Sequence, residues 1–320
     1  MMTEEINSRL RGCVYSIFTP FTDDDQIDYE TLARYMRHLF DGGARIFYAM
    51  AYNSRYAQLS NDEILELNAF VCREARRLDP ACFVIVGDPI HCTTKVSTEF
   101  ARHAKENGAD MISLLVQEKY YCDEQILEHF DEVGRDSDFP VLVHEMAFLS
   151  GMDGKQMHWP TSLLSKLRSV SSIAALKEDA KTPEITRAAL ALEPDIRVVV
   201  SGAKAKLFQY REDGVQAYLN GVSMIDARIG QIFWKAFETG DDALAQRIVD
   251  EVETPFFAGA IASLGWHRVN KALLQAAGLF PHRRDRMPLK TISDAEHGQV
   301  VEEYASINNA WNSIVTDLQG

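Results

Sequence analysis

The sequence predicts an α/β protein built as a (β/α)8 TIM barrel with a C-terminal helical extension. Eight short apolar runs are each followed by a segment with apolar residues at helical spacing. An open doubly wound sheet has roughly five or six strands, so the higher number favours a closed barrel. Most of the runs are continuous rather than alternating, which is typical of parallel strands buried on both faces.

The expected strands and the helices between them follow one another along the chain. Strands are predicted at residues 12–18, 46–51, 82–87, 110–116, 140–144, 172–178, 196–201 and 214–219. Asp28 stands where an N-cap is expected, and Ser60 with Glu63 has the pattern of a capping box. From Asp241 onward the apolar spacing is helical only. We therefore expect one structural unit, in which residues 1–240 form the barrel and residues 241–320 form a helical extension packed on it.

Composition and charge limit the classes of partner and the cellular setting. The chain has 320 residues, of which 46% are hydrophobic, and a formal net charge of -14. We expect no binding to nucleic acid or to an anionic membrane, because both require basic patches. The five cysteines are an odd number without CxxC spacing, which favours a reducing, cytoplasmic setting. The N-terminal residues lack the apolar core of a signal peptide, and no apolar run approaches ~20 residues, so neither export nor membrane insertion is expected.

Lys177 is the candidate catalytic nucleophile, because it stands at the C-terminal tip of an apolar strand, where barrels carry their chemistry. Strand alternation places it on one face with Ile173 and Ala175. Apolar surroundings disfavour a charged ammonium, and a neutral lysine amine attacks ketones to form a Schiff base. The alternative is a solvated loop lysine, which is commoner after an apolar strand.

His144 is the candidate proton shuttle. It ends the preceding strand, and neighbouring barrel strands lie ~5 Å apart, so we expect it beside Lys177. An imidazole there would move protons during carbinolamine formation and carbon–carbon cleavage. The alternative is a histidine whose ring is satisfied by a loop carbonyl.

Further polar residues stand where apolar runs are expected to end. The candidates for substrate binding are Tyr52, Asn53, Arg55, Gly202 and Gln216, and Tyr121, next to Tyr120, is a further catalytic candidate. Arg55 is either a carboxylate-binding cation or a solvated charge. The chain has neither HExxH nor paired-cysteine spacing, so no metal site is expected. It also has no GxGxxG or P-loop after the first strand, so no cofactor is expected.

Several short motifs are spread over nearly the whole chain: Thr19-Pro20-Phe21 with Asp28, Leu59-Ser60 with Glu63, Gly108-Ala109-Asp110, Tyr120-Tyr121, Leu176-Lys177-Glu178, Ser201-Gly202 and Arg286-Met287-Pro288-Leu289. They resemble the motifs of the dihydrodipicolinate synthase and N-acetylneuraminate lyase family of class I aldolases. The resemblance implies that Lys177 forms an imine with pyruvate or another 2-oxo acid. It also implies an aldehyde as the second substrate or product, and a homotetramer.

The motifs that line the family's pocket are altered in this chain. Ala51-Tyr52-Asn53-Ser54-Arg55 replaces GTTGE, His144-Glu145-Met146-Ala147 replaces YNxP, Leu149 aligns with an arginine of the lysine-pathway synthases, and Gly202-Ala203-Lys204 replaces GDD. Because the threonine relay and the catalytic tyrosine are exchanged, we expect a Schiff-base aldolase or lyase that is not the lysine-pathway synthase. Two alternatives stay open: a dehydratase of 2-keto-3-deoxy sugar acids, and a degenerate barrel that only binds a small acid.

Overall fold

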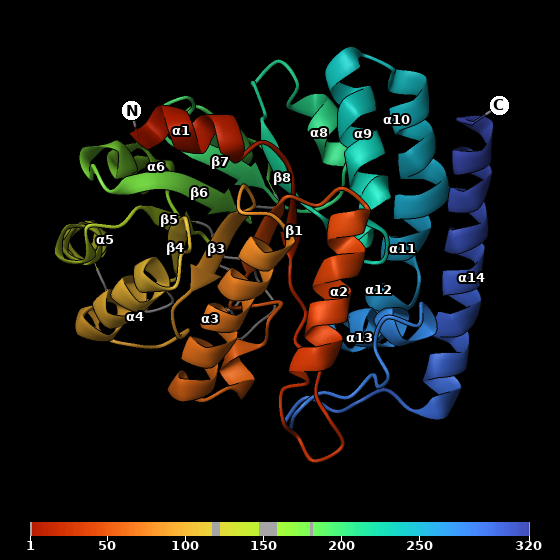
Figure 1. Ribbon diagram of the computed structural model, residues 1–320. Coiled ribbons are helices and arrows are strands. Elements are labelled where there is room, and N and C mark those ends of the chain that lie inside the picture. The colour runs from red at the N-terminus through yellow and green to blue at the C-terminus, as the bar shows by residue number, and fades with distance from the viewer. Residues whose placement is uncertain (1, 117–121, 147–158, 180–181, 320) are drawn as a thin grey trace. The chain divides into compact units, whose positions relative to one another are not determined.

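The computed structural model describes residues 2–116, 122–146, 159–179 and 182–319 (Figure 1). The chain forms two compact units. The first, the barrel unit, comprises Met1–Ser16, Arg45–Gly202 and Gln209–Leu219, and the second, the helical unit, comprises Ile17–Ala44, Ala203–Phe208 and Asn220–Gly320.

The barrel unit contains one closed sheet in which the strands follow the chain order from β1 to β8, and β8 pairs with β1. The strands are β1 (Gly12–Ser16), β2 (Ile46–Ala49), β3 (Phe83–Gly87), β4 (Met111–Leu114), β5 (Val141–His144), β6 (Ile173–Glu178), β7 (Arg197–Val200) and β8 (Ala217–Leu219). All pairs are parallel, and every residue of every strand is buried. The predicted (β/α)8 barrel is therefore confirmed.

Helices cover the outer side of these strands (Figure 1). The helices of this unit are α1 (Met2–Arg9), η1 (Tyr56–Gln58), α3 (Asn61–Leu78), α4 (Thr94–Glu106), α5 (Asp123–Ser137), α6 (Thr161–Lys166), η3 (Leu167–Ser169) and α7 (Pro183–Leu190). The predicted capping box of α3 is confirmed, since Ser60 and Glu63 bond each other's backbone amides. Helix α1 was not predicted: its polar sequence hides Ile6, which joins Leu10 in the apolar cluster inside the barrel.

The pairing of β5 with β6 sets the position of the candidate lysine. Val141 pairs with Ile173, but the next residue, Leu142, pairs with Ala175, so β6 carries one extra residue in a β-bulge. The predicted alternation is therefore wrong at Ile173, because Ala174 and Ala175 both enter the cluster inside the barrel. After the bulge the register is regular and pairs His144 with Lys177.

The helical unit contains the elements that the barrel unit leaves out. They are α2 (Tyr29–Asp41), α8 (Ala205–Gln209), η4 (Gly221–Met224), α9 (Ala227–Thr239), α10 (Asp242–Ile248), η5 (Val249–Glu253), α11 (Thr254–Ala258), α12 (Ala260–Leu264), α13 (Trp266–Ala276) and α14 (Asp294–Asp317). Asp28 caps α2 by accepting a hydrogen bond from the Thr31 amide, as predicted. Helix α10 packs on α9, and α14 packs on α13 and on the π-helical turn η5. The predicted domain boundary at residue 240 stays a prediction.

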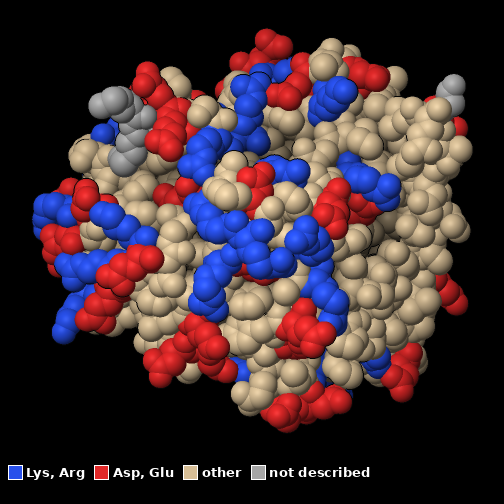
Figure 2. Space-filling model, in the orientation of Figure 1, with Lys and Arg blue, Asp and Glu red and all other residues tan. Residues whose placement is uncertain are grey.

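Charged side chains of both signs lie next to one another on the face shown in Figure 2. In the barrel unit, for example, Arg9 and Arg76 both pair with Asp110, at 2.7 and 2.8 Å. The expectation that nucleic acid is not a partner stays a prediction. None of the helices within the described ranges combines the length and the apolar character needed to span a bilayer.

Candidate active site

Lys177 lies at the carboxyl end of β6 and is almost fully buried, with 2% of its side chain exposed. The prediction that this strand carries it into the interior is confirmed, and the alternative of a solvated loop lysine is excluded. Its Nζ is 2.8 Å from Oδ2 of Asp179. The ammonium therefore has a carboxylate partner as well as apolar surroundings.

Asp179 is the residue that the sequence interpretation missed. Its Oδ1 accepts a hydrogen bond of 2.6 Å from Ser201 Oγ, which follows β7, and its backbone amide donates to Glu145 Oε2 at 3.4 Å. Contacts to the ends of β5, β6 and β7 thus hold the carboxylate against Lys177. Strand periodicity could have indicated Asp179, because a side chain two residues beyond Lys177 faces the same side of the strand.

His144 is buried directly beside Lys177, as predicted, with 1% of its surface exposed. Its Nε2 lies 3.7 Å from the same Asp179 Oδ2, beyond hydrogen-bond distance. Neither ring nitrogen has a hydrogen-bond partner among the described residues, so no loop carbonyl in those ranges satisfies it. Burial, reinforced by the positive charge of Lys177, lowers the pKa of His144 to about 4. The imidazole is therefore neutral at pH 7, and in this form it can accept a proton.

Two hydroxyl groups from other strands, which the sequence analysis did not identify, also lie in the interior. Tyr48 on β2 and Ser113 on β4 share a hydrogen bond of 2.5 Å between their hydroxyl oxygens. The Tyr48 ring lies 6.4 Å from the His144 ring, measured between centroids. Burial raises the pKa of Tyr48, so the phenol keeps its proton. The alternation of Ile46, Tyr48 and Met50 was the available signal, because all three enter the cluster inside the barrel.

The loop after β2 carries three of the predicted binding residues. Asn53 is buried and donates to Ser16 Oγ at 2.7 Å, while Tyr52 is partly buried against the apolar cluster inside the barrel. Arg55 adopts a left-handed conformation with φ 61° and donates from Nε to Gln58 Oε1 at 3.3 Å. Burial raises the pKa of Tyr52, the charge of Arg55 opposes that rise, and the charge of Asp179 adds to it. Tyr52 therefore lies within the electrostatic reach of both charges.

Two more binding candidates have different outcomes. Gly202 follows Ser201 at the carboxyl end of β7 and has φ 96°, a left-handed conformation suited to glycine. The predicted position of Gln216 is wrong: it precedes β8, and its carbonyl accepts from the Gly12 amide at the start of β1. The reason is that β8 begins only at Ala217, so Gln216 lies at the amino end of the strand, away from the Lys177 end. Tyr121, Tyr120 and Leu149 lie outside the described residues.

Glu145 links the ends of β5 and β6 rather than joining the group around Lys177. Its two carboxylate oxygens accept from the Trp159 and Asp179 amides, at 3.2 and 3.4 Å, and its own amide donates to the Lys177 carbonyl at 3.0 Å. Burial raises the pKa of its carboxyl group. Within the described ranges no three His, Cys, Asp or Glu side chains come together as ligands for a metal ion.

Comparison with known proteins supports the fold and the family. The chain matches the family model of the dihydrodipicolinate synthetase family over residues 9–306. An uncharacterized DapA-like lyase of Pyrococcus abyssi is 30% identical over 138 residues, a stretch that spans 42% of this chain and only 44% of that relative. A longer match joins 93% of this chain to 94% of an uncharacterized DapA-like lyase of Halobacterium salinarum, at 23% identity. A 4-hydroxy-tetrahydrodipicolinate synthase of Corynebacterium aurimucosum is 29% identical over 88% of this chain and 89% of its own.

Solved structures with the same fold include dihydrodipicolinate synthase from Aquifex aeolicus. It has a TM-score of 0.80 and 19% identity, and the match covers 93% of this chain and 98% of that chain. YagE of E. coli, a prophage protein of the dihydrodipicolinic acid synthase family solved in complex with pyruvate, has a TM-score of 0.78 and 18% identity over 93% of this chain and 98% of its own. At these identities the likeness concerns the fold alone.

Proposed function

Because this chain belongs to the dihydrodipicolinate synthetase family, we propose that it is a lysine Schiff-base lyase or aldolase acting on pyruvate or another 2-oxo acid. The observation that carries the proposal is the grouping around one oxygen atom: Asp179 Oδ2 lies 2.8 Å from Lys177 Nζ and 3.7 Å from His144 Nε2. A nucleophile, a carboxylate and a neutral base thus meet at the carboxyl end of the barrel, where such folds carry their chemistry.

In the proposed mechanism, Asp179 activates Lys177 for imine formation. The ammonium gives a proton to Oδ2, and the neutral amine attacks the carbonyl carbon of the 2-oxo acid. The carboxyl then returns the proton to the carbinolamine hydroxyl, which leaves as water while the carbon–nitrogen double bond forms. Ser201 keeps Oδ1 occupied through its 2.6 Å hydrogen bond and so orients Oδ2 toward Lys177.

In the proposed mechanism, His144 transfers the proton of carbon–carbon cleavage. In the iminium, the bond between C3 and C4 breaks as the C4 hydroxyl loses its proton to the neutral imidazole, and an aldehyde and an enamine result. The imidazolium then returns the proton to C3 of the enamine. Water hydrolyses the new iminium, which releases the 2-oxo acid and regenerates Lys177. With a pKa of about 4, His144 is in the accepting form at neutral pH.

The proposed substrate is not the aspartate semialdehyde of the lysine pathway. Arg55 brings a cation to the loop after β2, and Tyr52 beside it makes that loop aromatic. This arrangement suits a differently placed carboxylate or an aromatic aldehyde better than a short charged aldehyde. The pyruvate complex of YagE supports the choice of pyruvate as the first compound to test.

A homotetramer in the cytoplasm is also proposed. In the helical unit Phe257 stacks on Trp266 with ring centroids 6.1 Å apart, and both side chains are only partly buried. Such an aromatic surface suits a second copy of the chain. Sedimentation velocity at micromolar concentration measures the number of copies, and a single 36.1 kDa species would contradict the tetramer.

Borohydride trapping tests the proposed function. The full-length protein is incubated with pyruvate and a panel of other 2-oxo acids, reduced and digested, and the peptide with Lys177 should carry the added mass. The peptides with Lys204 and Lys271 are internal controls, because these lysines are also buried and also paired with carboxylates. An unmodified Lys177 across the panel would refute the imine.

Once a sugar acid that reacts is found, release of pyruvate indicates aldol cleavage, whereas an intact carbon chain indicates dehydration.

A further inference from the structure

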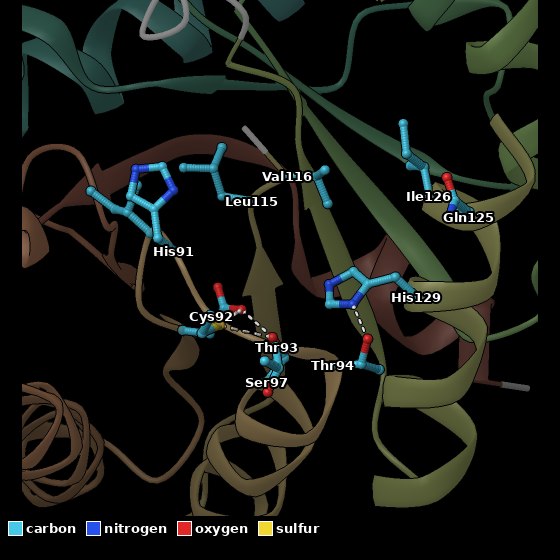
Figure 3. A pocket seen from close by; sticks show the side chains of 12 residues that line it. His91, Cys92, Thr93, Thr94, Ser97, Leu115, Val116, Gln125, Ile126 and His129 are labelled. Atoms are coloured by element: carbon cyan, nitrogen blue, oxygen red, sulfur yellow. Dashed lines mark hydrogen bonds between the residues drawn. The ribbon is translucent and has the colours of Figure 1, made fainter. Parts of the chain in front are cut away.

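A cavity of the barrel unit, of about 360 Å³, lies beside the carboxyl ends of β3 and β4 (Figure 3). Its described lining residues are Asp88, Ile90, His91, Cys92, Thr93, Thr94, Ser97, Leu115, Val116, Gln125, Ile126 and His129. They come from the ends of β3 and β4 and from the beginnings of α4 and α5. Lys177, His144 and Asp179 are not among these described lining residues.

Asp88 supplies a buried carboxyl group with spare hydrogen-bonding capacity to this cavity. The residue is 2% exposed. Its Oδ2 accepts from Ser97 Oγ at 2.7 Å and from Cys92 Sγ at 3.5 Å. Its Oδ1 has no hydrogen-bond partner among the described residues. A buried acceptor without a partner is costly, so a ligand that donates to Oδ1 would gain from binding.

Among the described residues of the wall, no Lys or Arg side chain is present to neutralise Asp88. His129 Nδ1 and Thr94 Oγ1 lie 3.0 Å apart in a hydrogen bond, and burial lowers the pKa of His129 to about 4, so that imidazole is neutral at pH 7. Figure 3 shows Leu115 and Val116 on one side of the cavity and Ile126 on another. The cavity therefore combines one acid, several hydroxyls and an apolar wall.

We propose that this cavity binds a small organic cation, a primary alkylammonium, with its nitrogen at Asp88 and its chain against the apolar side chains. The single unpartnered oxygen of Asp88 fits a compact ammonium better than a guanidinium, which prefers two oxygens in a fork. Leu115, Val116 and Ile126 provide contact surface for a short hydrocarbon chain. The proposal does not depend on imine formation at Lys177.

Binding should depend on pH through Asp88. Burial raises the pKa of its carboxyl group to about 7, although the hydrogen bonds from Ser97 and Cys92, followed by the backbone amides of Asp88 and Leu115, oppose the rise. An ammonium binds the ionised form and keeps its own proton in this range. Affinity should therefore be constant well above pH 7 and fall about tenfold per pH unit below it.

Other titratable groups face Asp88 from its own loop and from neighbouring elements. They are His91 and Cys92 on the loop, His129 on α5, Tyr48 on β2 and Tyr56 on η1. Burial raises the pKa of the Cys92 thiol to about 12 and also raises the pKa values of both tyrosines, so these three stay neutral. His91 also lines the cavity and is tested separately by substitution.

Isothermal titration calorimetry of the full-length protein with n-butylammonium tests the proposal. 1-Butanol, which has the same chain without the charge, and n-butylguanidinium are matched ligands, and K⁺ and Mg²⁺ are competitors. We expect n-butylammonium to bind at pH 8 at least about 10-fold more tightly than either matched ligand, since 1.4 kcal/mol corresponds to a factor of ten. Asp88→Asn should lose at least that factor, together with the pH dependence, while its circular dichroism spectrum reports folding.

Two further variants serve as controls. Asp123→Asn removes a carboxylate that pairs with Lys166 and is not among the cavity residues, so it should leave binding unchanged. His91→Gln should preserve the pH dependence if Asp88 is its source. Equal binding of 1-butanol, displacement by K⁺ or Mg²⁺, or unchanged binding in a folded Asp88→Asn variant would each overturn the proposal.

Discussion

Among the described residues, two of the buried lysine–carboxylate pairs have nearly the same contact distance but different surroundings. In the barrel unit Lys177 Nζ lies 2.8 Å from Asp179 Oδ2. In the helical unit Lys204 Nζ lies 3.0 Å from Glu253 Oε1, and both side chains are 1% exposed. Burial and charge pairing alone do not distinguish the two.

The surroundings of the two pairs do differ. Lys204 also donates to the Asn220 carbonyl at 3.2 Å and lies 5.9 Å from the centre of the Phe233 ring, while the Ala205 amide donates to the second oxygen of Glu253. Lys177 instead faces His144, whose ring nitrogens have no hydrogen-bond partner among the described residues. A closed network holds the fold together, whereas a partly satisfied one leaves groups that can engage a substrate.

The largest effect should come from replacing each lysine by methionine, which keeps an unbranched apolar stem. Lys177→Met removes the proposed nucleophile, so turnover should fall at least about 10,000-fold and borohydride trapping should disappear. Lys204→Met leaves Glu253 buried without its partner and should lower the free energy of unfolding by about 3–5 kcal/mol, measured by urea denaturation. The comparison breaks down if folded Lys177→Met still turns over substrate, or if Lys204→Met abolishes trapping at Lys177 in folded protein.

Replacement of the two carboxylates by amides sharpens the same contrast. Asp179→Asn keeps the shape but removes the proton acceptor, so the rate of imine formation should fall about 100-fold to 10,000-fold. Glu253→Gln should instead reduce stability and leave that rate unchanged in the folded protein. Quenched-flow reduction with borohydride gives both rates, and equal rates in wild type and Asp179→Asn would remove Asp179 from the mechanism.

The smallest effect should be a pH-dependent loss of stability caused by His144. Its pKa is lowered from 6.5 to about 4 in the folded protein, so between these values the unfolded chain binds a proton that the folded protein does not. Stability should therefore fall as the pH drops from 6.5 toward 4, by about 3 kcal/mol in total. His144→Gln should flatten this part of the urea-denaturation profile and also slow turnover, while imine trapping persists. An unchanged pH profile in the variant would show that His144 is not held neutral by burial.

Local patterns in the sequence were sufficient for most of the fold. The capping residues of α2 and α3, Asp28 and Ser60, act through contacts only three residues away, so their signal is complete within one turn. The neighbourhood of His144 and Lys177 also followed from chain order, because successive strands pair in a (β/α)8 barrel. The start of β8 could not be predicted from the sequence, because an apolar run does not reveal which of its residues have a pairing partner. Gln216 was therefore assigned to the wrong end of that strand.

The sequence by itself determined the barrel, the position of Lys177, the proposed nucleophile, at the tip of β6, and the histidine beside it. Only the tertiary structure decided the charge environment there: the bulge at Ile173 sets the register, and Ser201, from another strand, holds Asp179 against Lys177. It also decided that Asp88, which directly follows β3, is a buried acid beside a cavity. The reason is that hydrophobic period and caps are properties of neighbours in the chain, whereas a pKa depends on burial and on charges that distant segments bring together.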